Sequence, residues 1–162
     1  MLSTPWITYA ELRRLHNAAE AVERIHNSGR FALAEKLALE TGIRPYDLYL
    51  LLGEKMAARQ GRWSLDNLTR LVYDAFLSLG VDASALRDAM ILDRLATDNT
   101  GYLPPFLQGD PAALKAAARA YREAHPDTRH PRVALLTDGS AAVAVWTKKH
   151  PVTERGEVDI LK

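Results

Sequence analysis

Apolar residues recur every three to four positions through the first three quarters of the chain, a spacing typical of amphipathic helices. The first helix is predicted to start at Thr8, because Thr8 and Glu11 fit a capping box in which each side chain satisfies a backbone N–H group of the other. Gly29 is predicted to end it, since glycine readily adopts the left-handed conformation of a helix C-cap. The stripe expected to be buried consists of Leu12, Leu15, Ala19, Val22 and Ile25.

Five more helices are predicted from caps, proline positions and apolar stripes. They run from Arg30 or Phe31 to Thr41, from Pro45 through the apolar run 48–52, from Ser64 to Gly80, from Asp82 through Leu86 and Met90 towards Leu95, and from Asp110-Pro111 to Ala124. An irregular stretch is expected between the last two, because Asn99-Thr100-Gly101 and Pro104-Pro105 disfavour regular structure.

Valine replaces alanine and leucine as the characteristic apolar residue beyond Pro131, which favours strands. Asp138-Gly139 predicts a two-residue hairpin turn, because both positions tolerate positive φ. The flanking strands are Arg132–Thr137 and Ser140–Thr147. Both are apolar at consecutive positions, so each face is expected to be partly covered, by helices or by another chain. Glu157–Leu161 alternates and is a candidate third strand.

The predicted fold class is therefore mainly α. It is a five- to six-helix bundle with a small C-terminal antiparallel β-hairpin or three-stranded sheet, an α+β arrangement. We expect a single domain over 1–162, with a helical body at 8–124 and a β end at 132–161.

The composition of the chain excludes several kinds of site and argues against some classes of partner. The chain has 162 residues, a net charge of +1 and no cysteine. Without cysteine it can form no disulfide, thiolate zinc site or iron–sulfur cluster. A charge near zero argues against nucleic acid or anionic lipid as the main partner. The start Met1–Pro5 lacks the features of a secretory signal, and no apolar run is long enough to cross a membrane, so a cytoplasmic location is expected.

Few side chains suggest catalysis. His125, Asp127 and His130 are the one candidate metal site, that of a small metal hydrolase, and a solvated turn is the stronger interpretation. His16 and His26 are expected to be independent surface or boundary residues. No Gly-x-Ser-x-Gly, Walker or Gly-x-Gly-x-x-Gly motif is present.

Asp93 falls on the apolar stripe of the fifth predicted helix, where a charge needs a partner. We expect a carboxylate paired with an arginine such as Arg30, or with backbone N–H groups. A catalytic acid is the alternative.

Residues 34–43 followed by Leu48 have the spacing of a helix-turn-helix, which raises DNA binding as an alternative. The presumed recognition helix would present Tyr46, Asp47, Tyr49, Glu54 and Lys55. Because phosphate contacts need more lysine and arginine than this, an ordinary helical corner is favoured.

The order of several blocks resembles a known domain. The blocks are Leu12-x-x-Leu15, residues 20–24, residues 27–31, residues 44–49, Leu68-x-x-Leu71-Val72-Tyr73-Asp74, residues 86–95 and residues 101–107. They resemble a C-terminal domain of unknown function in bacterial cobalamin-binding radical S-adenosylmethionine iron–sulfur oxidoreductases. The resemblance implies that the chain is part of a larger protein, whose preceding domains hold the [4Fe–4S] cluster on a Cys-x-x-x-Cys-x-x-Cys motif, S-adenosylmethionine and cobalamin. No catalytic, cofactor-binding or metal residue of those domains falls on this chain.

The resemblance therefore implies a non-catalytic accessory domain whose partners are the cobalamin-binding and radical domains of the same polypeptide, and which helps to close their substrate pocket. Asn27, Arg30 and Asp93 are the candidate polar pocket residues, with capping and pairing inside the domain as the alternative. A different hypothesis is a free-standing interaction module that uses the edge of the β end, for example to form a homodimer.

Overall fold

A computed structural model describes residues 6–59, 63–98, 100–128, 130–149 and 155–161 of the chain. The chain divides into two compact units, Met1–Asp82 and Ala83–Lys162. The predicted mainly-α fold with a three-stranded antiparallel sheet is confirmed. The last two helices and the sheet belong to the second unit.

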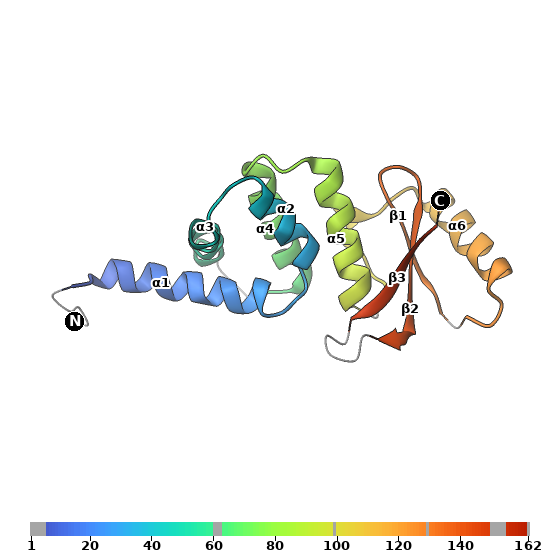
Figure 1. Cartoon of the computed structure of the whole chain (residues 1–162), viewed down its shortest axis with the longest axis horizontal. Coiled ribbons are helices and arrows are strands. Elements are labelled where there is room, and N and C mark those ends of the chain that lie inside the picture. Colours follow the sequence, from blue (N-terminus) through green and yellow to red (C-terminus); the bar gives the residue numbers. More distant parts are fainter. Residues whose placement is uncertain (1–5, 60–62, 99, 129, 150–154, 162) are drawn as a thin grey trace. The chain divides into compact units, whose positions relative to one another are not determined.

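The first unit is helical (Figure 1). Its elements are α1 Tyr9–Ala21, the π-helix η1 Val22–His26, α2 Ala32–Glu40, α3 Pro45–Ala57 and α4 Leu65–Ser78. The predicted local signals are confirmed: Thr8 and Glu11 form the capping box, Ser64 caps α4, and Pro45 opens α3. Gly29 adopts φ 64°, the left-handed conformation predicted for it.

The closest packing in this unit is between α1 and α3. A Cβ atom placed on Gly53 of α3 would lie 2.5 Å from the carbonyl carbon of Asn17 and 2.7 Å from the backbone nitrogen of Ala18. Distances this short leave no room for a methyl group, so only glycine lets the two backbones approach. Ala18 and Ala21 of α1 are buried at this crossing side of the helix.

The predicted buried stripe of α1 is wrong in its first half. Leu12 and Leu15 are 38% and 40% exposed, and Ala19 is exposed as well. The small residues Ala18 and Ala21 form the buried side instead, because a close backbone crossing favours small side chains over leucine. Periodicity identified the helix but assigned the packed face to the larger apolar residues.

The second unit combines helices with the sheet. Its elements are α5 Ala83–Thr97, the 3-10 helix η2 Pro105–Leu107, α6 Pro111–Ala124, β1 Arg132–Leu135, β2 Ala141–Lys149 and β3 Gly156–Leu161. The strand order is β1-β2-β3, all antiparallel, with Val143 opposite both Val133 and Asp159.

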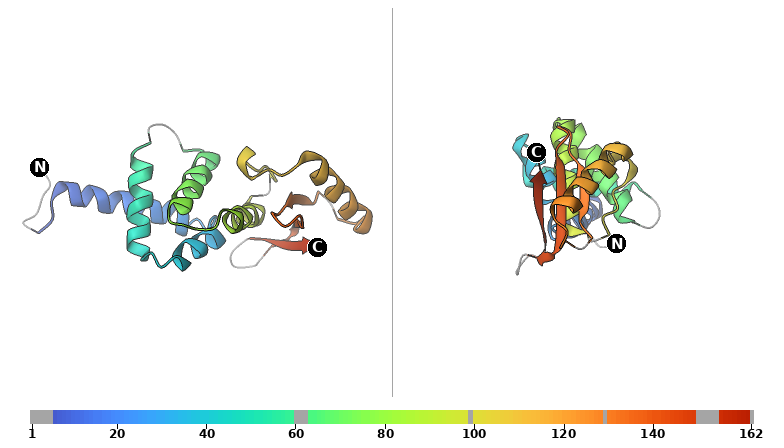
Figure 2. Two further views of the ribbon diagram at one scale, coloured as in Figure 1. Left: turned by 90° about the horizontal axis from the view of Figure 1, so that it is seen from above. Right: turned by 90° about the vertical axis from the view of Figure 1, so that its right-hand side faces the viewer.

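The sheet lies between α5 and α6 (Figures 1 and 2). Helix α5 contacts β2 and β3, and α6 contacts β1. All four residues 141–144 of β2 are therefore buried, although their side chains alternate between the two faces. The prediction that both faces of this strand are covered is confirmed.

The hairpin turn is longer than predicted. Strand β1 ends at Leu135 and β2 begins at Ala141, and Leu136 and Ser140 still share a hydrogen bond from Leu136 N–H to Ser140 C=O at 2.9 Å. Only Gly139, at φ 86°, has a positive φ in this loop. Thr137-Asp138-Gly139 thus forms a three-residue loop with glycine in the left-handed position, in place of the two-residue turn.

Two expectations concern residues outside the described part. These are the character of the start Met1–Pro5 and the place of Asn99 in the irregular stretch. Within the described residues, no helix combines the length and apolarity needed to cross a membrane.

Gly53→Ala tests the close crossing by the sign of its effect. In the interior of an ordinary exposed helix, replacing glycine by alanine raises the free energy of unfolding by about 0.8–1.0 kcal/mol, because alanine has the higher helix propensity. Here we expect the free energy of unfolding to fall by about 1–3 kcal/mol, because the methyl group meets backbone that cannot move aside cheaply.

Urea denaturation followed by circular dichroism measures this difference. Ala57→Ser, at an exposed position of the same helix, is the matched control and should change stability little. A Gly53→Ala variant more stable than the parent chain would contradict the crossing.

Candidate functional site

The candidate site lies at the end of α1, where the helix widens into a π-helical turn. The N–H group of Asn27 donates to the carbonyl of Val22, five residues earlier, at 3.0 Å. Such a turn inserts one extra residue into the helix and is often found at functional sites. It separates two surfaces of the first unit, one around Asn27 and one around His26.

The first surface is a pocket of about 360 Å³. It is lined by Glu23, Arg24, Asn27, Ser28, Arg30, Trp63, Ser64, Leu65 and Leu68. The structure thus brings together two of the three residues predicted from the sequence, Asn27 and Arg30. We refer to these nine residues as the Asn27 pocket.

Several polar side chains of the Asn27 pocket bind partners within the first unit. The Asn27 side-chain amide donates to Glu23 Oε2 at 2.7 Å, and Arg24 Nε lies 2.9 Å from Glu20 Oε1. Arg30 is exposed. The ring of Trp63 is covered by another guanidinium group, that of Arg59, whose Cζ lies 5.2 Å from the ring centroid. The exposed guanidinium of Arg30 suits a ligand that carries an anionic group.

The second surface centres on Glu35 of α2, a carboxylate only 8% exposed. Its Oε1 atom accepts hydrogen bonds from the Tyr49 hydroxyl of α3 and lies 2.9 Å from His26 Nδ1 of η1. Two causes raise the pKa of Tyr49 far above its ordinary value of 10.0. The larger is burial of the hydroxyl, and the second is its hydrogen bond to Glu35. Tyr49 therefore stays protonated and donates to the carboxylate.

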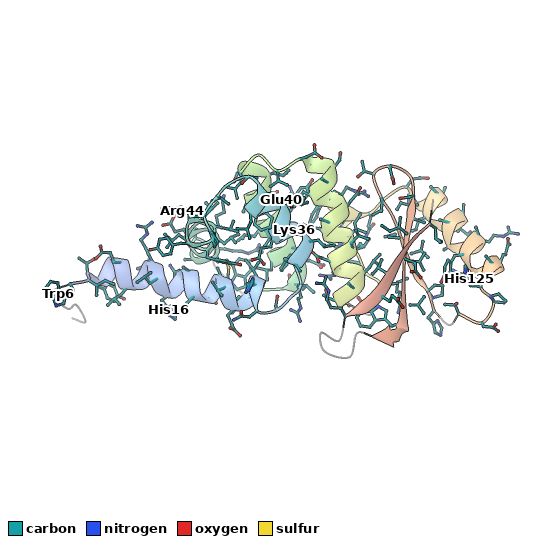
Figure 3. The ribbon with its side chains drawn as sticks, in the orientation of Figure 1. Trp6, His16, Lys36, Glu40, Arg44 and His125 are labelled. Carbon is teal, nitrogen blue, oxygen red and sulfur yellow. The ribbon has the colours of Figure 1, made fainter. Side chains whose placement is uncertain are left out.

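Beside this carboxylate runs a groove of about 480 Å³. Its lining residues are His26, Ala32, Glu35, Lys36, Leu39 and Glu40. Figure 3 labels Lys36 and Glu40 along α2. We refer to this as the His26 groove.

Sequence reasoning missed this cluster. It treated His26 as an independent surface residue, whereas His26 is bonded to Glu35. The available signal was Glu35 itself, which stands between the buried residues Ala34 and Ala38 on the apolar side of α2. An acid at such a position needs donors, and His26 and Tyr49 supply them.

Asp93 lies in the second unit and is 1% exposed, so its predicted burial is confirmed. Arg155 pairs with it, with Nη2 at 2.7 Å from Asp93 Oδ1. Asp93 is therefore paired with an arginine, as expected, but the partner is Arg155 of the same unit and not Arg30, which belongs to the first unit.

Two charged residues of α5, Arg87 and Asp88, form hydrogen bonds to the residues at the hairpin end of β1. Arg87 donates to the carbonyl of Leu107 at 3.0 Å and to that of Leu135 at 3.3 Å. Asp88 accepts from the N–H group of Thr137 at 2.9 Å and from its hydroxyl at 2.8 Å. Both residues belong to one of the blocks that carry the family resemblance, and in this structure they hold the fold together.

The alternative metal site does not form. The His125 ring stacks on Tyr121 with centroids 4.3 Å apart, and its Nδ1 lies 3.2 Å from the Tyr121 carbonyl. Across the described parts of the chain, no three histidine, aspartate or glutamate residues are grouped so that they could hold a metal ion. Asp127 and His130 accordingly do not join His125 in such a cluster.

Comparison with known proteins identifies the family of the chain. The model of a family described as "Protein of unknown function (DUF4080)" matches residues 1–149. The match extends through α6 and most of the sheet, beyond residues 9–107 that carry the resemblance in the sequence. No curated protein matches the chain. No solved structure matches it.

Arg155→Ala tests the buried ion pair. Removing the arginine leaves the Asp93 carboxylate in a site that is 1% exposed. We expect the free energy of unfolding to fall by about 3 kcal/mol, because the buried Asp93 carboxylate loses its ion pair with Arg155. Arg119→Ala is the control, since Arg119 and Glu123 are 81% and 64% exposed and such pairs contribute little. Equal stability losses in the two variants, measured by urea denaturation, would refute the role of Arg155.

The raised pKa of Tyr49 predicts how the stability of the chain changes at alkaline pH. Its pKa is raised in the folded chain, so its contribution to stability is complete below the unfolded value of about 10 and is lost as pH rises above it. In a titration followed by tyrosinate absorbance, Tyr49→Phe should remove ionisation above the ordinary tyrosine range and leave the step near pH 10 unchanged. A smaller step near pH 10 in the variant would show that Tyr49 titrates normally.

Proposed function

Since the chain belongs to the DUF4080 family of proteins of unknown function, we propose that it is a non-catalytic accessory domain of a cytoplasmic cobalamin-binding radical S-adenosylmethionine iron–sulfur oxidoreductase. In this role it packs on the enzyme core and helps to close the substrate pocket. The observation that carries the proposal is an apolar face of α1 that the first unit leaves exposed.

That face consists of Tyr9, Leu12, Leu15 and Ala19, and we call it the outer face of α1. Tyr9 is 59% exposed, and Leu12 and Leu15 are 38% and 40% exposed. At about 100° per residue, the four positions span an arc of about 120°, wide enough for a helix–helix contact. In Figure 3 His16, next to Leu15, points away from α3.

The proposed occupant of the outer face is the enzyme core of the same polypeptide. The resemblance places the cobalamin-binding and radical domains before a segment of this kind, and α1 is the described helix nearest to them along the chain. Trp6, three residues before the start of α1, is 93% exposed as well. Aromatic and leucine side chains left in water favour burial against a partner, with about 25 cal/mol gained per Å² of apolar surface covered.

Cofactor chemistry belongs to the preceding domains in this proposal. The chain has no cysteine, so a [4Fe–4S] cluster would be held by the Cys-x-x-x-Cys-x-x-Cys motif of the radical domain. S-adenosylmethionine and cobalamin would likewise be bound there. The contribution of this chain is the Asn27 pocket, in which Arg30 offers a positive charge to an anionic substrate group.

The candidate polar residues differ in what supports them. Asn27 and Arg30 share one pocket, which suits a role at a substrate surface, although Asn27 also pairs with Glu23 inside the unit. Asp93 is buried and paired with Arg155, which supports a structural role. Asp93 is therefore not part of the proposed pocket.

A free-standing interaction module is a second candidate, and one observation favours it. Strand β3 lies at an edge of the sheet, and its residue Ile160 is 52% exposed. An edge strand with an exposed apolar side chain can pair with a strand of another chain, including a second copy. Light scattering that found only monomer would argue against the homodimer.

The accessory role predicts a specific effect of charge on the outer face of α1. We expect Leu12→Asp/Leu15→Asp to weaken binding of residues 1–162 to the separately purified preceding domains at least about tenfold, equivalent to about 1.4 kcal/mol. The physical reason is that two leucines leave the interface and two carboxylates enter it. Isothermal titration calorimetry measures the dissociation constant.

The matched control is Ala113→Asp/Ala116→Asp, which adds the same two carboxylates, also three residues apart, to exposed positions of α6. An equal loss of affinity in both double variants would contradict the proposed surface. The reading frame upstream of Met1 gives an independent test: a Cys-x-x-x-Cys-x-x-Cys motif is expected there, and a stop codon would remove the proposed parent.

A further inference from the structure

We propose that the His26 groove is an acid–base site for a small molecule, in which His26 exchanges a proton with the ligand and Glu35 is the positioning residue. The ligand class is a small molecule that carries an ionisable O–H or N–H group together with a carboxylate or phosphate. The inference concerns residues of the first unit alone, and it does not depend on the accessory role.

The first support is the fixed orientation of the imidazole. Glu35 Oε1 lies 2.9 Å from His26 Nδ1, and the Glu35 side chain is only 10% exposed. A carboxylate at Nδ1 holds the proton on that nitrogen and leaves Nε2 as a proton acceptor. The His26 side chain is 61% exposed, so this acceptor is accessible to a ligand.

The second support is the way Glu35 is held. The Tyr49 hydroxyl donates to the same Oε1 atom from α3, while His26 approaches from η1. The rings of His26 and Tyr49 meet edge to face, with centroids 6.3 Å apart. Side chains from three elements, η1, α2 and α3, thus hold the Glu35 carboxylate and the His26 imidazole in place. An isolated surface ion pair has no such third partner.

The third support is the π-helical turn. His26 is the last residue of η1, and the inserted residue shifts its direction by about 100° relative to a continuous α-helix. The turn therefore determines that His26, in place of a neighbour, reaches Glu35.

The groove itself suggests the ligand class. Ala32 and Leu39 provide an apolar wall, and Lys36 provides a positive charge. Lys36 Nζ lies 4.0 Å from Glu40 Oε1, a loose pair in which both side chains are more than half exposed. An anionic group can replace this weak pairing, which places the ionisable O–H or N–H group of the ligand near His26.

The proposed step is a single proton transfer. The Nε2 lone pair takes the proton of the ligand O–H or N–H group, and the electron pair of that bond remains on the ligand. The resulting imidazolium keeps its Nδ1–H hydrogen bond to the Glu35 carboxylate, which stabilises the positive charge. The reverse step returns the proton, so no further reactant is required.

Reactivity of the imidazole tests this arrangement. Diethyl pyrocarbonate acylates neutral imidazole, and mass spectrometry reports the rate at each histidine of the intact chain. His16, exposed on α1, is the internal control. At a pH about two units above the ordinary histidine value of about 6.5, we expect His26 to react several-fold faster than His16, and Glu35→Gln to abolish the difference.

Equal rates at His26 and His16, or a His26 rate that Glu35→Gln leaves unchanged, would overturn the proposal. If Glu35→Gln fails to fold, the nitrogen-15 shifts of His26 in the unaltered chain decide the question. A proton on Nδ1 supports the site, and a proton on Nε2 overturns it.

The ligand class has its own test, with inorganic phosphate as the probe. Phosphate should shift the His26 and Lys36 resonances of the unaltered chain and leave those of His26 in Lys36→Ala unchanged. Absence of a shift in the unaltered chain would remove the anionic group from the proposed ligand.

Discussion

The first unit depends on one steric constraint, the absence of a side chain at Gly53. Helix α3 comes so close to α1 that a methyl group there would meet the backbone of Asn17 and Ala18. The crossing fixes which side of α1 is packed, and small residues form that side. The larger apolar residues Leu12 and Leu15 are consequently turned outward, where they form the surface proposed to contact the enzyme core.

The same helix also sets the geometry of both polar surfaces. Its π-helical end directs Asn27 into one pocket and His26 towards Glu35 beside another. A docking face, a polar pocket and a buried carboxylate network are therefore arranged around one helix. This arrangement fits an accessory domain that contributes side chains to a site built mainly by its partners, which is the proposed function.

Signals from neighbouring residues predicted the helices well, whereas contacts between residues far apart in the sequence were not predicted. The caps at Thr8 and Ser64 and the start at Pro45 depend on neighbouring residues, so sequence alone identified them. The packed face of α1 depends on Gly53, far along the chain. Likewise, Asp93 was predicted to be buried, but its partner Arg155 lies 62 residues away, a separation at which no sequence spacing indicates contact. Asn27 and Arg30 were found as candidates, whereas the Glu35 network was not, because its three members come from three elements.

The most direct test of the central claim is side-chain footprinting of α1 with hydroxyl radicals. Labelling of Tyr9, Leu12 and Leu15 is compared between residues 1–162 alone and the proposed longer protein, with Tyr46 of α3, which is 59% exposed like Tyr9, as the reference. All three residues are expected to be labelled in the isolated chain and strongly protected in the proposed longer protein. Equal labelling in the two would contradict the claim that the outer face of α1 contacts the enzyme core.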